Sequence, residues 1–213
     1  MEKAKELGGN ARRVRTTLDG LDVPAFVAEL VRRVRQHPRI HVYTAAIILD
    51  AAGYVGNFLT RVKTRGRTVE IKHGATVIAT GADEHRPTEY LYGQDPRVLT
   101  QLALEGLLWK GGARSGGAEG AAPSTGAGGD PLEGVRRVVM IQCVGCREEE
   151  RNYCARICCS QAVKNALAIK KLRPDVDVSI LFRDMRTYGF REDAYREAAE
   201  KHVTFVRFEA DDK

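Results

Sequence analysis

Hydrophobic side chains recur at helical spacing near the start of the chain. Over residues 23–36 they return every three or four positions, with arginines and other polar side chains between them. Asp22 stands where an N-cap residue is expected, and Pro38 follows the last periodic position. This pattern predicts one amphipathic helix over 23–36.

A different pattern follows, in which short apolar runs are separated by Gly53, Gly56 and Gly66. Short runs bounded by glycines are typical of strands joined by tight turns. They predict an antiparallel β-meander, and one further strand that leads into Thr80-Gly81. The predicted strands cover residues 40–44, 45–50, 58–63, 68–72 and 75–79.

After residue 131, strand-like and helix-like segments alternate. This alternation predicts a parallel, Rossmann-like βαβαβ sheet, in which ligands gather at the carboxyl ends of the strands. Cys143 comes directly after the first of these strands. The predicted order is strand 137–142, helix 153–171, strand 176–182, helix 192–201 and strand 203–208.

A stretch rich in glycine and alanine, GGARSGGAEGAAPSTGAGGD, separates the two halves. It holds too few large apolar side chains to pack against a core, which predicts a flexible linker. The expected organisation is an α/β chain with a partial nucleotide-binding domain and the meander over 1–110, a linker over 111–131, and the βαβαβ domain over 132–213.

The composition narrows the classes of function. A chain of 213 residues with 43% hydrophobic content can bury a core. Its formal net charge of +6 comes from dispersed arginines without interleaved aromatic residues, so we expect no nucleic-acid partner. No run of about 18 apolar residues occurs, and MEKAKELGG lacks the apolar core of a signal peptide. We therefore expect no membrane span and a cytoplasmic location.

All five cysteines of the chain fall between residues 143 and 159, and they are called here the cysteine cluster. In a reducing cytosol, such crowding indicates metal or redox chemistry more than structural disulfides. Three sites fit the residues: a 4Fe-4S cluster, a dithiol–disulfide pair, or a zinc ion or inert thiols. The predicted helix also places Cys154 and Cys158 at i, i+4 on one face. In order, the cluster consists of Cys143, Cys146, Cys154, Cys158 and Cys159.

Three further places are candidates for cofactor binding. Thr80-Gly81 ends a predicted strand, and small residues there let a cofactor approach the backbone. Gly8-Gly9 offers the same freedom, although a plain turn explains either pair equally well. Arg186 follows a predicted parallel strand, where it could hold a phosphate or a flavin edge, or lie in solvent.

At these motifs the sequence resembles the A subunit of heterodisulfide reductase and its bacterial relatives, flavoproteins of the thioredoxin-reductase-like class. The resemblance covers nearly the whole chain outside the linker. It depends on ELGGNARR at 6–13, GYVGNF at 53–58, the long segment 74–105, VVMIQCVG, YCARICC and DMRTYG.

The resemblance implies an FAD domain with a Rossmann-like reductase fold and a 4Fe-4S cluster beside the flavin. The cluster ligands would be Cys143, Cys154, Cys158 and Cys159, whereas Cys146 stands where relatives usually carry serine. Glu2 aligns with the carboxylate that accepts hydrogen bonds from the FAD ribose. No residue is assigned a catalytic role. The expected partners are other subunits of such a complex and ferredoxin-type or hydrogenase-type electron donors.

The sequence departs from that pattern where the G-x-G-x-x-G turn should precede the chain. Ferredoxin-like C-x-x-C-x-x-C modules are missing too. A fragment of a split gene, or a second polypeptide that supplies the missing turn, would explain the difference. We expect the isolated chain to bind FAD poorly. The alternative function is a non-catalytic interaction module whose cysteines hold zinc or an isolated cluster.

Overall fold

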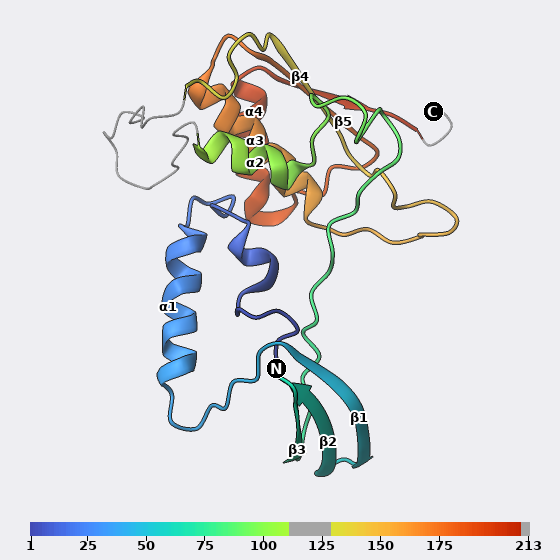
Figure 1. Ribbon diagram of the computed structural model, residues 1–213. Helices are drawn as coiled ribbons and strands as arrows, with labels where there is room; N and C mark the ends of the chain where they lie inside the picture. The colour runs from blue at the N-terminus through green and yellow to red at the C-terminus, as the bar shows by residue number, and fades with distance from the viewer. Residues whose placement is uncertain (111–128, 210–213) are drawn as a thin grey trace. The chain divides into compact units, whose positions relative to one another are not determined.

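The computed structural model describes residues 1–110 and 129–209, and these form two compact units (Figure 1). The first unit consists of 1–12 and 24–83, and the second of 13–23 and 84–213. The predicted linker 111–131 lies outside the described residues apart from 129–131. The predicted domain boundaries therefore stay a prediction.

The first unit combines a helix with a three-stranded antiparallel sheet in the order β1-β2-β3, which confirms the predicted meander. Val62 is fully buried at the centre of β2, whose inward residues alternate with exposed ones as expected for a sheet with one covered face. The helix agrees with the predicted span. The elements are η1 (Gly9–Arg12), α1 (Val23–Gln36), β1 (Ala46–Tyr54), β2 (Asn57–Thr64) and β3 (Arg67–His73).

Two strands predicted for this unit were wrong. Residues 40–44 form no strand, although the backbone N–H of Glu2 donates to Tyr43 at 2.8 Å. Residues 75–79 are also not a strand, and Val77 and Ile78 are 89% and 82% exposed. Their apolar character suits a strand, but no described segment lies beside them to complete a ladder.

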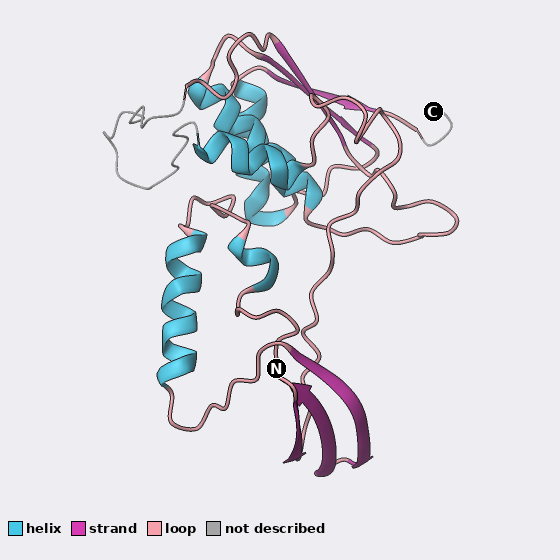
Figure 2. Ribbon diagram, viewed as in Figure 1, coloured by secondary structure: helices cyan, strands magenta, loops and turns pink. Residues whose placement is uncertain are grey.

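The second unit contains a parallel sheet in the order β4-β5-β6, with α3 and α4 as the crossover connections (Figure 2). The predicted alternation of strands and helices is confirmed, so the chain is mixed α/β. The helix α2 was not predicted. The elements are α2 (Gln101–Lys110), β4 (Arg137–Ile141), α3 (Cys158–Leu172), β5 (Asp177–Phe182), η2 (Gly189–Arg191), α4 (Glu192–Glu200) and β6 (Val203–Arg207).

One hydrophobic core joins these helices to the sheet. Ala162, Val163, Ala166 and Ile169 form the inner face of α3 and are fully buried, as is Ile180 on β5. Because all three strands run in the same direction, their carboxyl ends meet at one edge of the sheet. No helix in the described part of the chain is long and apolar enough to cross a membrane.

The start of α3 differs from the prediction. The helix begins at Cys158, five residues after the predicted Tyr153. Arg156 has a φ of +58°, in the left-handed region, which a right-handed helix cannot include. Cys154 therefore lies in the loop before α3, and the predicted i, i+4 pairing of Cys154 with Cys158 on one helix face was wrong.

Candidate functional site

The cysteine cluster lies at the carboxyl edge of the parallel sheet, where the alternating pattern predicted a site. Residues 142–157, the cysteine loop, connect the end of β4 to the first turn of α3. The loop leaves the strand through Cys143, whose φ is +63°, and turns at Gly145, whose φ is +67°. The backbone N–H of Cys146 donates to the carbonyl of Cys143 at 3.4 Å, which closes a β-turn.

Arg147 fixes this loop to the end of the neighbouring strand. Its guanidinium lies 2.5 Å from Asp184, just beyond β5, and its carbonyl accepts a hydrogen bond of 2.7 Å from the Arg183 side chain. Burial opposes the charge of Arg147, but hydrogen bonds to Asp184 and Cys143 raise its pKa. The loop that holds Cys143 is thus connected to β5 through polar contacts.

Two adjacent cysteines begin α3. Cys159 is 2% exposed, and its sulfur lies 3.7 Å from the carbonyl oxygen of Asp184. The pKa of Cys159 is lowered, first because the Cys158 thiol donates a hydrogen bond to its sulfur and further because the N–H and charge of Arg186 favour the thiolate. The same interaction, together with burial, raises the pKa of Cys158.

The two remaining thiols are half-buried in the loop. The Cys154 sulfur accepts a hydrogen bond from the N–H of Arg156 at 3.3 Å. Burial raises the pKa of Cys146, and the electrostatic influence of the neighbouring Cys143 and Cys154 raises it further. Cys146 therefore shares one electrostatic environment with two of the proposed ligands.

Within the described residues, no three histidine, cysteine, aspartate or glutamate side chains are gathered as a metal site. The surroundings of the thiols nevertheless suit an anionic group. Gln142 Nε2, Arg147 Nη1 and Arg186 Nε are buried nitrogen donors without a hydrogen-bond partner. Buried donors are normally satisfied, and a thiolate-ligated iron–sulfur cluster carries negative charge that accepts such hydrogen bonds. These three donors are thus available to an anionic group bound next to the thiols.

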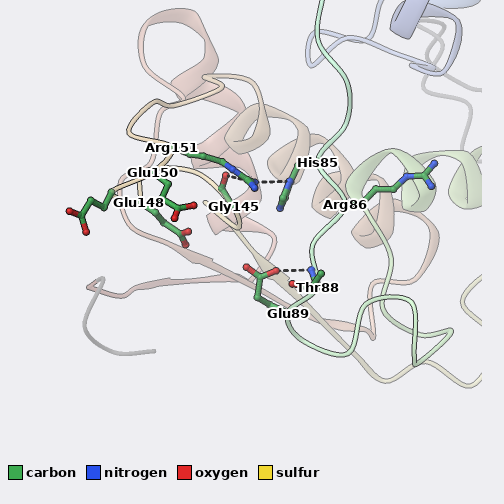
Figure 3. Close-up of a pocket in the computed structure, with 9 residues that line it drawn as sticks. His85, Arg86, Thr88, Glu89, Gly145, Glu148, Glu150 and Arg151 are labelled. Atoms are coloured by element: carbon green, nitrogen blue, oxygen red, sulfur yellow. Dashed lines mark hydrogen bonds between the residues drawn. The ribbon is translucent and has the colours of Figure 1, made fainter.

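A cavity of about 390 Å³ borders the cysteine loop. Figure 3 shows Arg151 pointing across it towards His85, and these side chains lie 3.2 Å apart between Nη1 and Nδ1. Arg151 Nη1 also donates to the carbonyl of Gly145 at 3.5 Å. The cavity is lined by His85, Arg86, Thr88, Glu89, Gly145, Glu148, Glu149, Glu150 and Arg151.

The sequence did not indicate His85 or Arg147 as part of the site. Arg147 follows Cys146 directly, so its position next to a thiol was a signal that could have been used. Nothing local identifies His85, because it lies 66 residues before its partner Arg151.

The residues expected to hold FAD lie mostly in the first unit. Gly8 and Gly9 have φ values of +113° and +46°, and Gly81 has +68°. The Asn10 side chain donates a hydrogen bond to the carbonyl of Ala82, which brings the Gly8-Gly9 turn and Thr80-Gly81 together. The sequence did not single out Asn10, although it directly follows the glycine pair.

Of the two other expected residues, Glu2 also belongs to the first unit, whereas Arg186 belongs to the second. Glu2 pairs through its backbone with residues 43 and 46, and its carboxylate accepts the N–H of Ala4 at 2.9 Å. Arg186 lies 4.0 Å from Asp184 and acts on Cys159, so the structure places it beside the thiols. Its expected contact with a phosphate or a flavin stays a prediction.

Comparison with known proteins confirms the resemblance to the A subunit of heterodisulfide reductase. The A subunit of the ferredoxin:CoB-CoM heterodisulfide reductase from Methanosarcina acetivorans is 36% identical over 163 residues, covering 65% of this chain and 20% of that protein. The iron-sulfur A subunit of the CoB-CoM heterodisulfide reductase from Methanocaldococcus jannaschii is 38% identical over 154 residues, covering 69% and 22%.

A longer alignment exists with an iron-sulfur A subunit of the CoB-CoM heterodisulfide reductase from Methanopyrus kandleri. It is 26% identical over 296 residues and covers 97% of this chain and 43% of that protein. The chain spans about a fifth of the length of the first two relatives. No family model matches the chain.

Proposed function

We propose that the chain is an electron-transfer segment of a heterodisulfide-reductase-like complex that relays electrons between FAD and a 4Fe-4S cluster. The observation that supports this most is the environment of the cysteine cluster. Five cysteines lie in the loop and first helix turn that follow β4, and three buried nitrogen donors of the same region lack hydrogen-bond partners. The homology to the A subunit of heterodisulfide reductase supports the same redox role.

In this proposal Cys143, Cys154, Cys158 and Cys159 bind the iron atoms as thiolates. The first turn of α3 favours those charges, because its free amide groups and helix dipole stabilise anions. Arg186 offsets part of the negative charge of a cluster, since its charge already favours the Cys159 thiolate. A bound 4Fe-4S cluster supplies one-electron transfer.

The first unit would hold part of the flavin. Gly9 and Gly81 both have positive φ, and no described atom lies within 4 Å of the Cβ position of either residue. A planar or phosphorylated group can therefore approach the backbone at both residues. Thr80, Gly8 and the carboxylate of Glu2 are the remaining residues proposed for FAD.

The partners are proposed from the relatives. The names of several relatives specify ferredoxin or hydrogen and identify each protein as one subunit of several, so those proteins act within larger assemblies. We propose that this chain likewise acts with other subunits and a ferredoxin-type or hydrogenase-type donor in the cytoplasm.

The test is metal and flavin analysis of the anaerobically prepared chain, with EPR spectra before and after dithionite. About four iron atoms per chain are expected, with a signal that appears on reduction. The variant C154S should lose most of the iron because it removes a proposed ligand. The matched control C146S removes a neighbouring thiol of the same loop and should retain the iron.

The outcomes separate this function from its alternative. Zinc, or no metal at all, would contradict electron transfer and favour a non-catalytic module. Equal iron loss in C154S and C146S would contradict the proposed ligand set. Iron without flavin would support the 4Fe-4S cluster and contradict the proposal that this chain binds FAD.

A further inference from the structure

Cys143 and Cys146 are joined by a tight β-turn, which the binding of a 4Fe-4S cluster does not by itself require. Its two central residues are Val144 and Gly145, and the N–H of Cys146 donates back to the carbonyl of Cys143. Gly145 has a φ of +67°, as the third residue of a type II turn does. A β-turn holds its first and fourth α-carbons within about 7 Å. Disulfides span roughly 4.4–6.8 Å between α-carbons, so the separation that a β-turn imposes overlaps the range a disulfide needs.

Within the cysteine cluster, only Cys158 and Cys159 are neighbours in the sequence, and they are less suited to form a disulfide. Cys158 and Cys159 are consecutive in α3, so their α-carbons are only about 3.8 Å apart, below the usual range. Successive side chains on a helix also point in different directions. Cys159 is buried, whereas Cys143 and Cys146 are partly exposed and accessible to a small oxidant.

We propose that Cys143 and Cys146 are a redox-active pair that closes to a disulfide across the turn when the protein meets a low-molecular-weight disulfide. One cysteine sulfur attacks the small disulfide, which forms a mixed disulfide and releases one thiol. The second cysteine then attacks the protein sulfur of that mixed disulfide and releases the other thiol. Two electrons pass from the protein thiols to the small disulfide, and their two protons leave on the two released thiols.

Formation of the Cys143–Cys146 disulfide also competes with binding of the 4Fe-4S cluster. This step rests on the proposed function. Cys143 is a proposed iron ligand, and a sulfur bonded to Cys146 is no longer a thiolate. The disulfide therefore withholds one of four ligands, and a bound cluster protects Cys143 from oxidation. Oxidation and cluster loading exclude each other at this residue.

The experiment uses the full chain and oxidised glutathione, followed by trypsin and mass spectrometry without reduction. Trypsin separates the thiols cleanly, because Cys143 and Cys146 share the peptide 138–147, Cys154 lies on 152–156, and the other two cysteines lie on 157–164. In the metal-free chain, most of peptide 138–147 should become lighter by two hydrogens. In the iron-loaded chain the same conversion should be at least about tenfold slower.

The controls separate this inference from the proposed function. C146S should lose the conversion and carry only a glutathione adduct at Cys143, while C154S should retain it. A metal-free chain that forms only glutathione adducts, or that links 138–147 to another peptide, would overturn the pair. Equal oxidation with and without bound iron would overturn the competition alone. A chain that binds no iron but closes the turn would leave the pair standing and remove the proposed function.

Discussion

The imidazole of His85 occupies the space that a Cβ on Gly145 would fill, and Gly145 lies between Cys143 and Cys146 in the cysteine loop. A Cβ at Gly145 would lie closer than 3.0 Å to three atoms of the His85 ring, a separation that real Cβ atoms essentially never show. Arg151 contacts both residues, with its Nη1 3.2 Å from His85 and 3.5 Å from the Gly145 carbonyl (Figure 3). His85, which is distant from the cysteine loop in the sequence, thus packs against the turn of that loop.

Substitution G145A should disturb the turn for two reasons. The positive φ disfavours any side chain, which costs about 1–3 kcal/mol, and the new methyl group displaces His85 from Arg151. We expect lower stability in urea unfolding and a smaller yield of the Cys143–Cys146 disulfide.

Gly134 offers a matched control. Its φ is +73°, but no described atom lies within 4 Å of its Cβ position, so G134A imposes backbone strain without a clash. G145A should therefore be more destabilising than G134A. In the double variant H85A/G145A, the extra destabilisation of G145A relative to G134A should disappear. Equal destabilisation by G145A and G134A would show that the His85 contact contributes nothing.

The unpartnered buried donors predict an electrostatic effect on the proposed cluster. Replacing Arg186 by glutamine removes a positive charge beside Cys159, so the oxidised, less negative cluster is favoured. The midpoint potential should fall by roughly 10–60 mV, at most about a tenfold change for a one-electron couple. Redox titration followed by EPR measures it.

The control for this effect is Arg196, which pairs with Glu192 on the exposed surface of α4. R196Q changes the net charge by the same amount and should leave the potential unchanged, because solvent screens a distant exposed charge. An equal shift in R186Q and R196Q would mean that the net charge, not the local contact, sets the potential.

The sequence was informative where pattern alone determines structure. The helix over 23–36 has the predicted bounds, because its apolar periodicity ends just before Pro38. The alternation after residue 131 predicted the parallel sheet, and with it the position of Cys143 at the carboxyl edge. The mixed α/β class and the homology to the A subunit of heterodisulfide reductase are both supported.

The failures concern features that depend on tertiary contacts or on single backbone angles. The helix α2 was missed because apolar residues such as Leu104, Leu107 and Leu108 leave no consistent polar face. The late start of α3 follows from the left-handed Arg156, which periodicity cannot reveal. The contact between His85 and Gly145 joins segments 60 residues apart, so no local signal could predict it.

Gly53, in the hairpin between β1 and β2, leaves no room for a side chain. Gly53 has a φ of +111°, and its Cβ would overlap the backbone carbonyl of Asn57, which cannot move aside without breaking the ladder. G53A should therefore destabilise the sheet by more than the roughly 1–3 kcal/mol of backbone strain. G56A in the adjoining turn has open space around the Cβ position and should cost only that strain. Thermal unfolding of the two variants compares them, and equal melting temperatures would contradict the overlap.

The buried pair Glu105–Lys164 should be costly to break. Lys164 Nζ lies 2.8 Å from Glu105 and donates to the Thr16 carbonyl at 2.7 Å, while the N–H of Arg15 donates to the same carboxylate at 2.6 Å. The Glu105 side chain is 6% exposed, so removing its partner leaves a charge buried.

We expect K164M to lower the free energy of unfolding by about 3–5 kcal/mol, as measured by urea denaturation. The comparison is K201M on α4, where Lys201 pairs with Glu197 at the surface and should cost at most about 0.5 kcal/mol. In the double variant E105Q/K164M the unpaired charge is gone, so stability should partly return. If K164M and K201M lower the free energy of unfolding by the same amount, the Glu105 carboxylate is accessible to water. The hydrogen bond from Lys164 to Thr16 then does not stabilise the packing of segment 13–23 on α3.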